Sequence, residues 1–236
     1  MTSKSVAGYR VGILTLDTAH PLELGNVQHA ESFPFPVVYA VVRAVSMSAL
    51  MDGDPSALQP ILTAIGELNR QGVSVIVGAC GSFANYQQQA TQASSVPVFM
   101  SILLEVPFIL RALPPDKKLG IIFANAATFT QRVRSECGID DTSRIVAVGA
   151  NTIPAFGAIL RQEQLLDGAA LERGLVELAQ DTLRKQPSIG AWLLQCSDLP
   201  PYAAALQRAT SLPVFDAHLL IDHLFRASRR TTFAFP

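Results

Sequence analysis

The chain has 236 residues, of which 49% are hydrophobic and 16% charged, so it holds enough apolar material for a substantial core. Its 18 basic and 19 acidic residues give a net charge of −1, which argues against a nucleic-acid partner because no basic excess is present to neutralise phosphates. The richest apolar stretch, 96–113, falls short of the roughly 20 uninterrupted apolar residues of a membrane span, and residues 1–10 lack the apolar core of a signal peptide. We therefore expect a cytoplasmic protein without a membrane partner.

Short apolar runs alternate with longer amphipathic ones along most of the chain, which is typical of βαβ units and predicts a mostly parallel sheet. Strands are predicted at 11–16, 74–79, 96–100, 119–124, 144–148, 191–195 and 213–215. Helices are predicted where leucine and isoleucine recur at helical spacing, at 58–68 before Gly72 and at 171–183. Ser82 and Ser197 each follow a strand and are predicted to cap helices.

One stretch, 17–36, breaks this alternation because it contains three prolines and two histidines, His20 and His29. A loop of this length inside a compact domain is commonly functional. We interpret it as a flap near the carboxyl ends of the strands, where its histidines approach a ligand. The apolar residues 37–45 that follow are interpreted as core or as a dimer interface, which leaves open whether the chain forms a homo-oligomer.

Comparing the chain with itself reveals a repeated pattern. When Cys80 is aligned with Cys196, an offset of 116 (196 − 80), seven of 20 positions match without a gap. The matches include the Pro-Val-Phe segments at 97–99 and 213–215. A register kept over this distance indicates an internal duplication rather than a chance likeness.

A second match lies upstream, where 11–13 and 119–121 share an apolar-Gly-Ile pattern at an offset of 108 (120 − 12). This offset sets Asp17 against Asn125, and both are candidates for holding a substrate. One insertion of eight residues (116 − 108) between the two matched regions reconciles the offsets.

The duplication predicts an α/β fold of two pseudo-symmetric, flavodoxin-like halves with mostly parallel sheets. We assign 1–101 and 212–236 to the first half and 102–211 to the second. In each half a strand delivers a cysteine to the sheet edge where ligands bind in open α/β folds. A helix N-terminus at that edge lowers the pKa of a thiol and can hold a carboxylate. Cys80 and Cys196 are therefore predicted to face each other across one cleft.

Two thiols on opposite sides of a carbon centre can remove a proton from one face and return one to the other, which inverts the stereocentre. The developing negative charge then needs hydrogen-bond donors aimed at the neighbouring carboxylate. The candidate substrate-binding residues are Asp17, Gly81, Ser82, Asn85, Asn125, Ser197 and Asp198. Asp198 has an alternative role as a helix cap. No phosphate-binding glycine loop or Schiff-base lysine is recognisable, so we expect no cofactor and no metal.

The third cysteine, Cys137, has no counterpart in the duplication and is interpreted as core filling.

These motifs resemble those of the aspartate/glutamate racemase superfamily, which includes hydantoin racemases. The resemblance covers nearly the whole chain and is carried by the segments 78–82, 96–99, 119–121, 196–202 and 213–216. It implies two pseudo-symmetric α/β halves, an active site between them and proton transfer by paired cysteines without a cofactor. Carried over to this chain, those cysteines are Cys80 and Cys196.

Two departures argue against an ordinary glutamate racemase. Glutamate racemases usually carry Cys-Asn-Thr at the first cysteine, where this chain has Cys80-Gly81-Ser82, and Asp-Ser-Gly after the first strand, where it has Thr-Leu-Asp-Thr at 15–18. The departures leave the substrate open. Because both cysteines are present, we predict a racemase or epimerase, within the isomerases, that acts on a small carboxylate, an amino acid or a hydantoin.

Three alternatives stay open. A maleate-type cis–trans isomerase uses one thiol as a nucleophile and the other for proton transfer. Related decarboxylases keep only one cysteine of the pair. A two-lobed protein that binds a small anion without catalysis is the alternative from another class.

Overall fold

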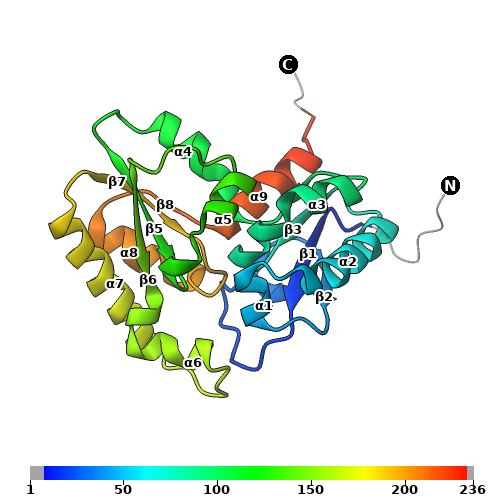
Figure 1. Cartoon of the computed structure of the whole chain (residues 1–236), viewed down its shortest axis with the longest axis horizontal. Coiled ribbons are helices and arrows are strands. Elements are labelled where there is room, and N and C mark those ends of the chain that lie inside the picture. Colours follow the sequence, from blue (N-terminus) through cyan, green and yellow to red (C-terminus); the bar gives the residue numbers. More distant parts are fainter. Residues whose placement is uncertain (1–7, 233–236) are drawn as a thin grey trace.

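The computed structural model describes residues 8–232, so residues 1–7 and 233–236 of the predicted first half lie outside the described residues. Its strands are β1 (Val11–Leu16), β2 (Val37–Val42), β3 (Val75–Gly78), β4 (Val98–Phe99), β5 (Lys118–Phe123), β6 (Ile145–Gly149), β7 (Ile189–Leu194) and β8 (Val214–Phe215). They form two parallel four-stranded sheets, in the orders β2-β1-β3-β4 and β6-β5-β7-β8 (Figure 1). The same order in both sheets confirms the α/β fold of two similar halves.

The described residues also form α-helices, some of which cover the outer faces of the sheets while others pack between the two halves. These are α1 (Met47–Asp52), α2 (Leu58–Gln71), α3 (Gln87–Ala93), α4 (Val106–Ala112), α5 (Gln131–Glu136), α6 (Gly157–Leu160), α7 (Gly168–Lys185), α8 (Ala203–Thr210) and α9 (Ala217–Ser228). The two predicted helices are α2 and α7. α2 ends at Gly72, whose φ of 72° is a left-handed conformation that favours glycine. α7 begins where the Asp167 side chain accepts from the backbone N–H of Ala170.

Two local predictions are corrected by the structure. The segment 37–45 contains β2, an edge strand that pairs with β1, and it was not predicted as a strand. Ser82 and Ser197 do not cap α-helices. Ser82 lies inside the 3₁₀ helix Gly81–Tyr86, and Ser197 lies in a turn before the 3₁₀ helix Pro200–Tyr202. In both halves a tight turn therefore separates the cysteine from the next α-helix.

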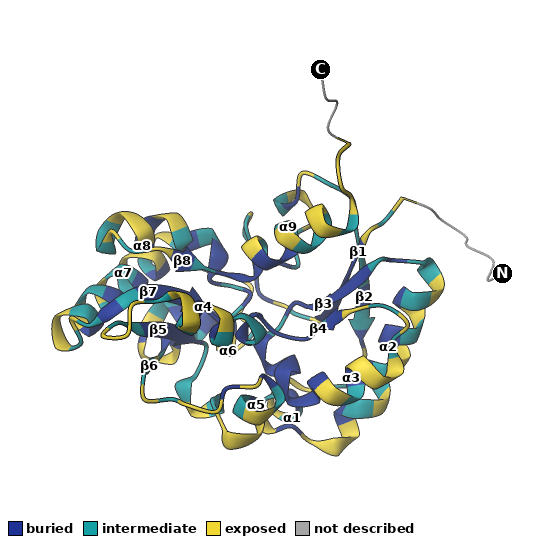
Figure 2. Cartoon of the chain, turned by 90° about the horizontal axis from the view of Figure 1, so that it is seen from above, coloured by how far each residue is buried: buried dark blue, intermediate teal, exposed yellow. Residues whose placement is uncertain are grey.

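Alternate residues of the central strands face different cores, as the period of two in a β-strand requires. In β1, Val11 and Ile13 enter a core shared by both halves, while Leu14 and Leu16 pack with α2. The shared core also contains residues of β5, β7, α4 and α9, and α9 lies between the two halves in both ribbon views (Figures 1 and 2). Figure 2 shows the outward helix faces as exposed, while β1, β3, β5 and β7 are the most deeply buried strands. The halves are thus joined by packed apolar surface.

The end of the chain divides between the two halves. The predicted division gave 212–236 to the first half, whereas β8 pairs with β7 in the second sheet through Trp192 and Val214. α9 then contacts β1 and β3. The backbone therefore returns to the first half after β8. β8 is the last strand of the second sheet, as β4 is the last strand of the first.

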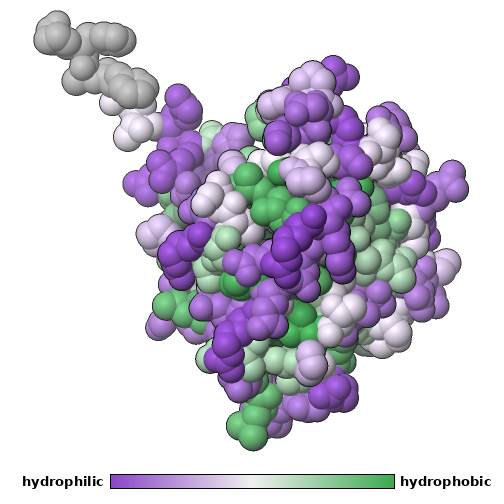
Figure 3. All heavy atoms as spheres, turned by 90° about the vertical axis from the view of Figure 1, so that its left-hand side faces the viewer, coloured by the Kyte–Doolittle hydropathy of each residue, from purple (hydrophilic) through white to green (hydrophobic). Residues whose placement is uncertain are grey.

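Hydrophilic residues cover most of the face seen in Figure 3, on the side of the second half, with hydrophobic residues visible between them. Large apolar side chains that stay exposed come from different elements, and they are Leu24, Met47, Phe108, Leu160, Leu165 and Leu219. Within residues 8–232, no helix combines the length and the apolar character needed to cross a membrane.

Candidate active site

The two thiols occupy equivalent places in the two halves. Cys80 comes two residues after the end of β3, and Cys196 comes two residues after the end of β7. Both line one pocket, which encloses about 620 Å³ of empty space including its opening to solvent. The structure thus brings Cys80 and Cys196 together at a single pocket.

The close approach of the two strand ends depends on a glycine. A Cβ atom built on Gly81 would lie 2.0 Å from Nε2 of Gln195 and 2.6 Å from its backbone oxygen, which is closer than real Cβ atoms come. Gln195 directly precedes Cys196, so the backbone after β3 packs against the backbone that carries the second thiol. Any larger residue at Gly81 has to push the two cysteine-bearing segments apart.

Burial raises the pKa of both thiols. For Cys80 the pKa rises to about 11, although the backbone and hydroxyl of Ser82 make hydrogen bonds that favour the thiolate. For Cys196 burial and then the Asp198 carboxylate raise the pKa well above its usual value. The predicted lowering by a helix N-terminus is not observed, because desolvation outweighs the hydrogen bonds of one tight turn. The surroundings of Cys80 favour a thiolate more than those of Cys196, because Ser82 makes hydrogen bonds to Cys80 whereas Cys196 donates its proton to the Asp198 carboxylate.

Asp198 is the centre of a polar network in the pocket wall. Its Oδ1 accepts a hydrogen bond of 2.6 Å from Nδ2 of Asn26 and lies 2.9 Å from Nε2 of His20. Its Oδ2 accepts from Sγ of Cys196 at 3.4 Å. The alternative role of Asp198 as a helix cap is not observed, since its two oxygens are directed at the flap and at the thiol.

The flap at 17–36 crosses from the first half to the second. The backbone N–H of Ala19 donates to Oε1 of Gln162 at 2.8 Å, and that of Val27 donates to the carbonyl of Ser197 at 3.4 Å. Together with the bonds to Asp198, these contacts make the flap a wall of the pocket.

Four of the seven predicted substrate-binding residues line the pocket, namely Gly81, Ser82, Ser197 and Asp198. The other three do not, because their side chains have structural partners elsewhere. Asp17 is exposed and lies 3.8 Å from Arg43. The Asn85 amide donates to backbone carbonyls, including that of Ser82 at 3.2 Å, and the Asn125 side chain accepts from the backbone N–H of Ala127.

Several lining residues were not predicted from the sequence. The large apolar side chains among them come from both halves, and they are Met47, Met51, Phe156, Ile159 and Leu160. The flap contributes His20 and Gln28, and Gln162 and Gln195 come from the second half. Of these, only His20 had a signal in the sequence, as a histidine in an unusually long loop.

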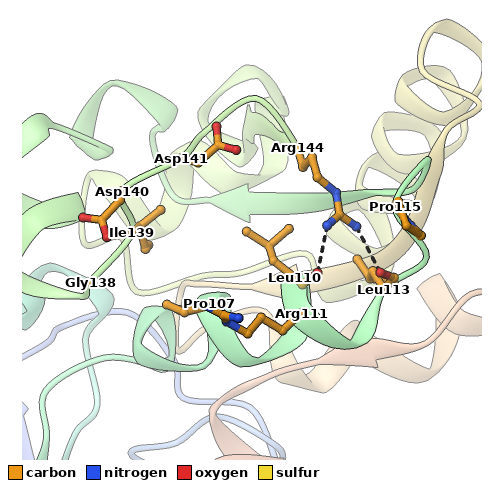
Figure 4. Close-up of a pocket in the computed structure, with 10 residues that line it drawn as sticks. All are labelled: Pro107, Leu110, Arg111, Leu113, Pro115, Gly138, Ile139, Asp140, Asp141 and Arg144. Atoms are coloured by element: carbon orange, nitrogen blue, oxygen red, sulfur yellow. Dashed lines mark hydrogen bonds between the residues drawn. The ribbon is translucent and has the colours of Figure 1, made fainter.

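A second hollow lies on the second half, between α4 and the loop that leads to β6 (Figure 4). Arg144 crosses it, and its guanidinium donates to the backbone carbonyls of Leu110 at 3.0 Å and Leu113 at 3.2 Å. No cysteine or histidine lines this hollow. Its acidic groups are the carboxylates of Asp140 and Asp141, without a thiol or an imidazole, so the thiol pocket is the candidate active site.

The remaining cysteine is separate from this chemistry. Cys137 is 4% exposed in the shared core and does not line the pocket. Among residues 8–232, no three His, Cys, Asp or Glu side chains gather into a potential metal site.

Sequence comparison places the chain among curated proteins, although no protein-family model matches it. It is 34% identical to "Dimethylsulfoniopropionate lyase" of Durusdinium sp. clade D over 224 residues, which cover 92% of this chain and 74% of that protein. The chain belongs to the dimethylsulfoniopropionate lyase family. It is also 36% identical over 217 residues to "Dimethylsulfoniopropionate lyase 3" of Emiliania huxleyi, covering 88% of this chain but only 56% of that relative. This member of the family thus spans little more than half the length of its Emiliania relative.

Solved structures confirm the fold of the aspartate/glutamate racemase superfamily for this lyase-family chain. A glycine-to-cysteine mutant of arylmalonate decarboxylase superposes with a TM-score of 0.60 at 17% identity, covering 96% of each chain. An aspartate racemase homologue from Pyrococcus horikoshii gives a TM-score of 0.59 at 16% identity, covering 93% of this chain and 98% of that one.

The racemase or epimerase activity predicted from the paired thiols is wrong, and so is the isomerase class, because the curated relatives of this lyase-family chain are named lyases. Inversion of a carbon stereocentre and β-elimination share their first step, in which a base removes a proton from the carbon next to a carboxylate. They differ in whether the substrate carries a group that can leave from the next carbon, and a protein sequence does not display that group.

Proposed function

We propose that this chain cleaves dimethylsulfoniopropionate by β-elimination. A base removes a proton from the carbon next to the carboxylate, the electron pair forms the new carbon–carbon double bond, and the bond from the neighbouring carbon to sulfur breaks with its electrons going to sulfur. The products are dimethyl sulfide, acrylate and one proton. The observation that carries the proposal is the 34% identity to the Durusdinium lyase over 92% of this chain.

The base in this proposal is Cys80, acting as its thiolate. The hydrogen bonds from Ser82 favour the charged form of Cys80, whereas the hydrogen bond to the Asp198 carboxylate favours the protonated form of Cys196. Cys196 stays protonated, and in the structure its single S–H donates to the Asp198 carboxylate. In the proposed reaction this S–H turns from Asp198 to the charge that develops on the substrate. The leaving dimethyl sulfide is neutral and needs no proton, so a single base is sufficient for the elimination.

The charges of the pocket support a zwitterionic substrate with a sulfonium group. Asp198 is the carboxylate of the lining, and no lysine or arginine is among the lining residues within 8–232. A cation is attracted to Asp198, and its methyl groups can pack against apolar lining residues such as Met47, Met51 and Phe156. The substrate carboxylate has the backbone and hydroxyl groups of Ser82 and Ser197 as donors.

The direct test is to incubate the purified chain with dimethylsulfoniopropionate and to measure dimethyl sulfide by headspace gas chromatography and acrylate by liquid chromatography. We expect both products in equal amounts, at a rate proportional to the protein concentration. A buffer blank and heat-denatured protein serve as controls. A chain that is folded by circular dichroism and releases neither product would overturn the proposal.

The pH dependence follows from the raised pKa of Cys80. At neutral pH nearly all of this thiol is protonated, and the thiolate fraction grows about tenfold per pH unit until the pH approaches the pKa, which is about 11. We therefore expect kcat/KM to rise steadily between pH 7 and pH 9, measured from initial rates of dimethyl sulfide release. A flat or falling profile over this range contradicts a thiolate base.

A further inference from the structure

His20 occupies an unusual position for a flap residue. Its side chain is 3% exposed, and its Nε2 lies 2.9 Å from Oδ1 of Asp198. Its second ring nitrogen, Nδ1, is buried and has no hydrogen-bond partner. The residue lines the same pocket as both thiols. A buried ring with one nitrogen on a carboxylate and the other unpartnered can gain a second proton without breaking an existing hydrogen bond.

Among the charged groups around Asp198 and His20, His20 is the one that can offset the negative charge of the Asp198 carboxylate. Asp198 also accepts from the amide of Asn26, which is neutral. The other ionisable groups that interact with Asp198 are acids, namely the thiols of Cys80 and Cys196 and the hydroxyl of Tyr202. Tyr202 in turn donates to the carboxylate of Glu23. Among the pocket-lining residues in the described part of the chain, only a protonated His20 offsets the negative charge of Asp198.

We propose that His20 is a positioning residue that sets, through Asp198, whether the pocket selects a cation. With a neutral ring, Nε2–H donates to Oδ1 and holds the carboxylate as a full negative charge in the pocket wall. With a protonated ring, the positive charge cancels that of Asp198, and the pocket loses its preference for a cation. This inference rests on the proposed function, since it assigns the Asp198 carboxylate to the sulfonium group of the substrate.

The direction of the effect follows from the surroundings of the ring. Burial lowers the pKa of His20, but the hydrogen bond and the charge of Asp198, together with a hydrogen bond to the Gln162 side chain, raise it by more, so the net pKa lies above its usual value. The ring therefore gains its second proton at a higher pH than an ordinary histidine does. Cation selectivity is present at higher pH and is lost as the pH decreases.

The test measures the charge selectivity of the pocket without using a substrate. The chain is treated separately with two methanethiosulfonate reagents of similar size, one carrying a trimethylammonium group and one a sulfonate group. Trypsin separates the three cysteines, because Cys80, Cys137 and Cys196 fall in the peptides 71–111, 135–144 and 186–208. Mass spectrometry under non-reducing conditions then gives the modification rate of Cys196 with each reagent. The thiolate fraction cancels in the ratio of the two rates, so the ratio reports the local charge.

For the wild-type chain we expect the cation-to-anion ratio at Cys196 to fall by about tenfold or more between pH 9 and pH 6, since a unit charge at this range shifts such equilibria by about one pKa unit or more. His20→Gln retains an amide donor but cannot take up a charge, so its ratio should stay high at both pH values. Asp198→Asn removes the carboxylate, so its ratio should stay low at both.

The matched control is His29→Gln, a flap histidine that does not line the pocket, and it should follow the wild type. The inference is overturned if His20→Gln shows the wild-type change with pH, or if Asp198→Asn keeps it. His20→Asn is the second variant should His20→Gln not fold, and circular dichroism checks each variant.

An activity measurement separates this inference from the proposed function. With dimethylsulfoniopropionate, KM should rise as the pH falls towards 6 in the wild type, while in His20→Gln it should stay nearly constant. A chain that releases no dimethyl sulfide refutes the proposed function. The cation-to-anion ratio of the Cys196 modification rates still tests the role of His20 in that case. A chain that releases dimethyl sulfide but has a pH-independent ratio refutes only the inference.

Discussion

Replacing Cys80 by alanine is expected to lower kcat/KM for dimethylsulfoniopropionate by about 10³-fold, because a positioned general base contributes roughly 10²–10⁴-fold to a proton transfer. Cys196→Ala should cost less, about fivefold, since it removes one hydrogen bond worth about 1 kcal/mol. Initial rates of dimethyl sulfide release at a fixed pH give both values. The unequal losses follow from the surroundings of the two thiols, where Ser82 favours a thiolate at Cys80 and Asp198 opposes one at Cys196.

The control for these variants is Cys137→Ala. This cysteine is buried in the shared core away from the pocket lining, so its replacement should leave kcat/KM within about twofold of the wild type. Equal losses for Cys80→Ala and Cys137→Ala would mean that the variants report stability rather than catalysis. A larger loss for Cys196→Ala than for Cys80→Ala would reverse the assignment of the base.

Replacing Gly81 by alanine is expected to reduce activity by about 100-fold or more and to lower stability by about 2 kcal/mol. The added Cβ would lie 2.0 Å from Nε2 and 2.6 Å from the backbone oxygen of Gln195, so the segments that carry the two thiols have to move apart. Displacements near 1 Å at reacting groups cost about two orders of magnitude in rate. Thermal unfolding should show a Tm lower by about 4–8 °C, as expected for a chain of this size.

The matched glycine variant is Gly66→Ala in α2. Its Cβ would meet only Nη1 of Arg70, at 3.6 Å, and the position is helical. Alanine there should raise stability by about 0.5–1 kcal/mol and leave activity unchanged. If Gly81→Ala behaved like Gly66→Ala, the packing between the strand ends would not control the site.

The duplicated pattern predicts the fold well because it reflects topology. The cysteines follow equivalent strands, β3 and β7, and the repeated Pro-Val-Phe segments at 97–99 and 213–215 lead into equivalent edge strands, β4 and β8. A match between distant segments indicates which strands of the two sheets are equivalent. Equivalent strands of two parallel sheets with the same strand order end at equivalent positions along the sheet edge. The meeting of Cys80 and Cys196 at one pocket could therefore be predicted without coordinates.

Side-chain direction is where prediction from the sequence ends. Asn85 is only a few residues from Cys80 in the chain, but its amide turns to backbone carbonyls such as that of Leu50 at 3.1 Å. Asn125 caps its own turn instead of facing the pocket. Conversely, Met47 and Phe156 line the pocket from segments that carry no motif. These orientations depend on packing between elements far apart in sequence, which periodicity and spacing do not encode.

The chain passes from the first half to the second between β4 and β5 and returns between β8 and α9, with α4 and α9 both packed into the shared core. Opening the two halves relative to each other would have to bend two backbone connections at once and expose the apolar side chains of the shared core to water. The two halves should therefore behave as one rigid body during turnover. Access for a small ligand is then governed by residues 17–25 of the flap, most of which are at least partly exposed and which are held mainly by polar contacts.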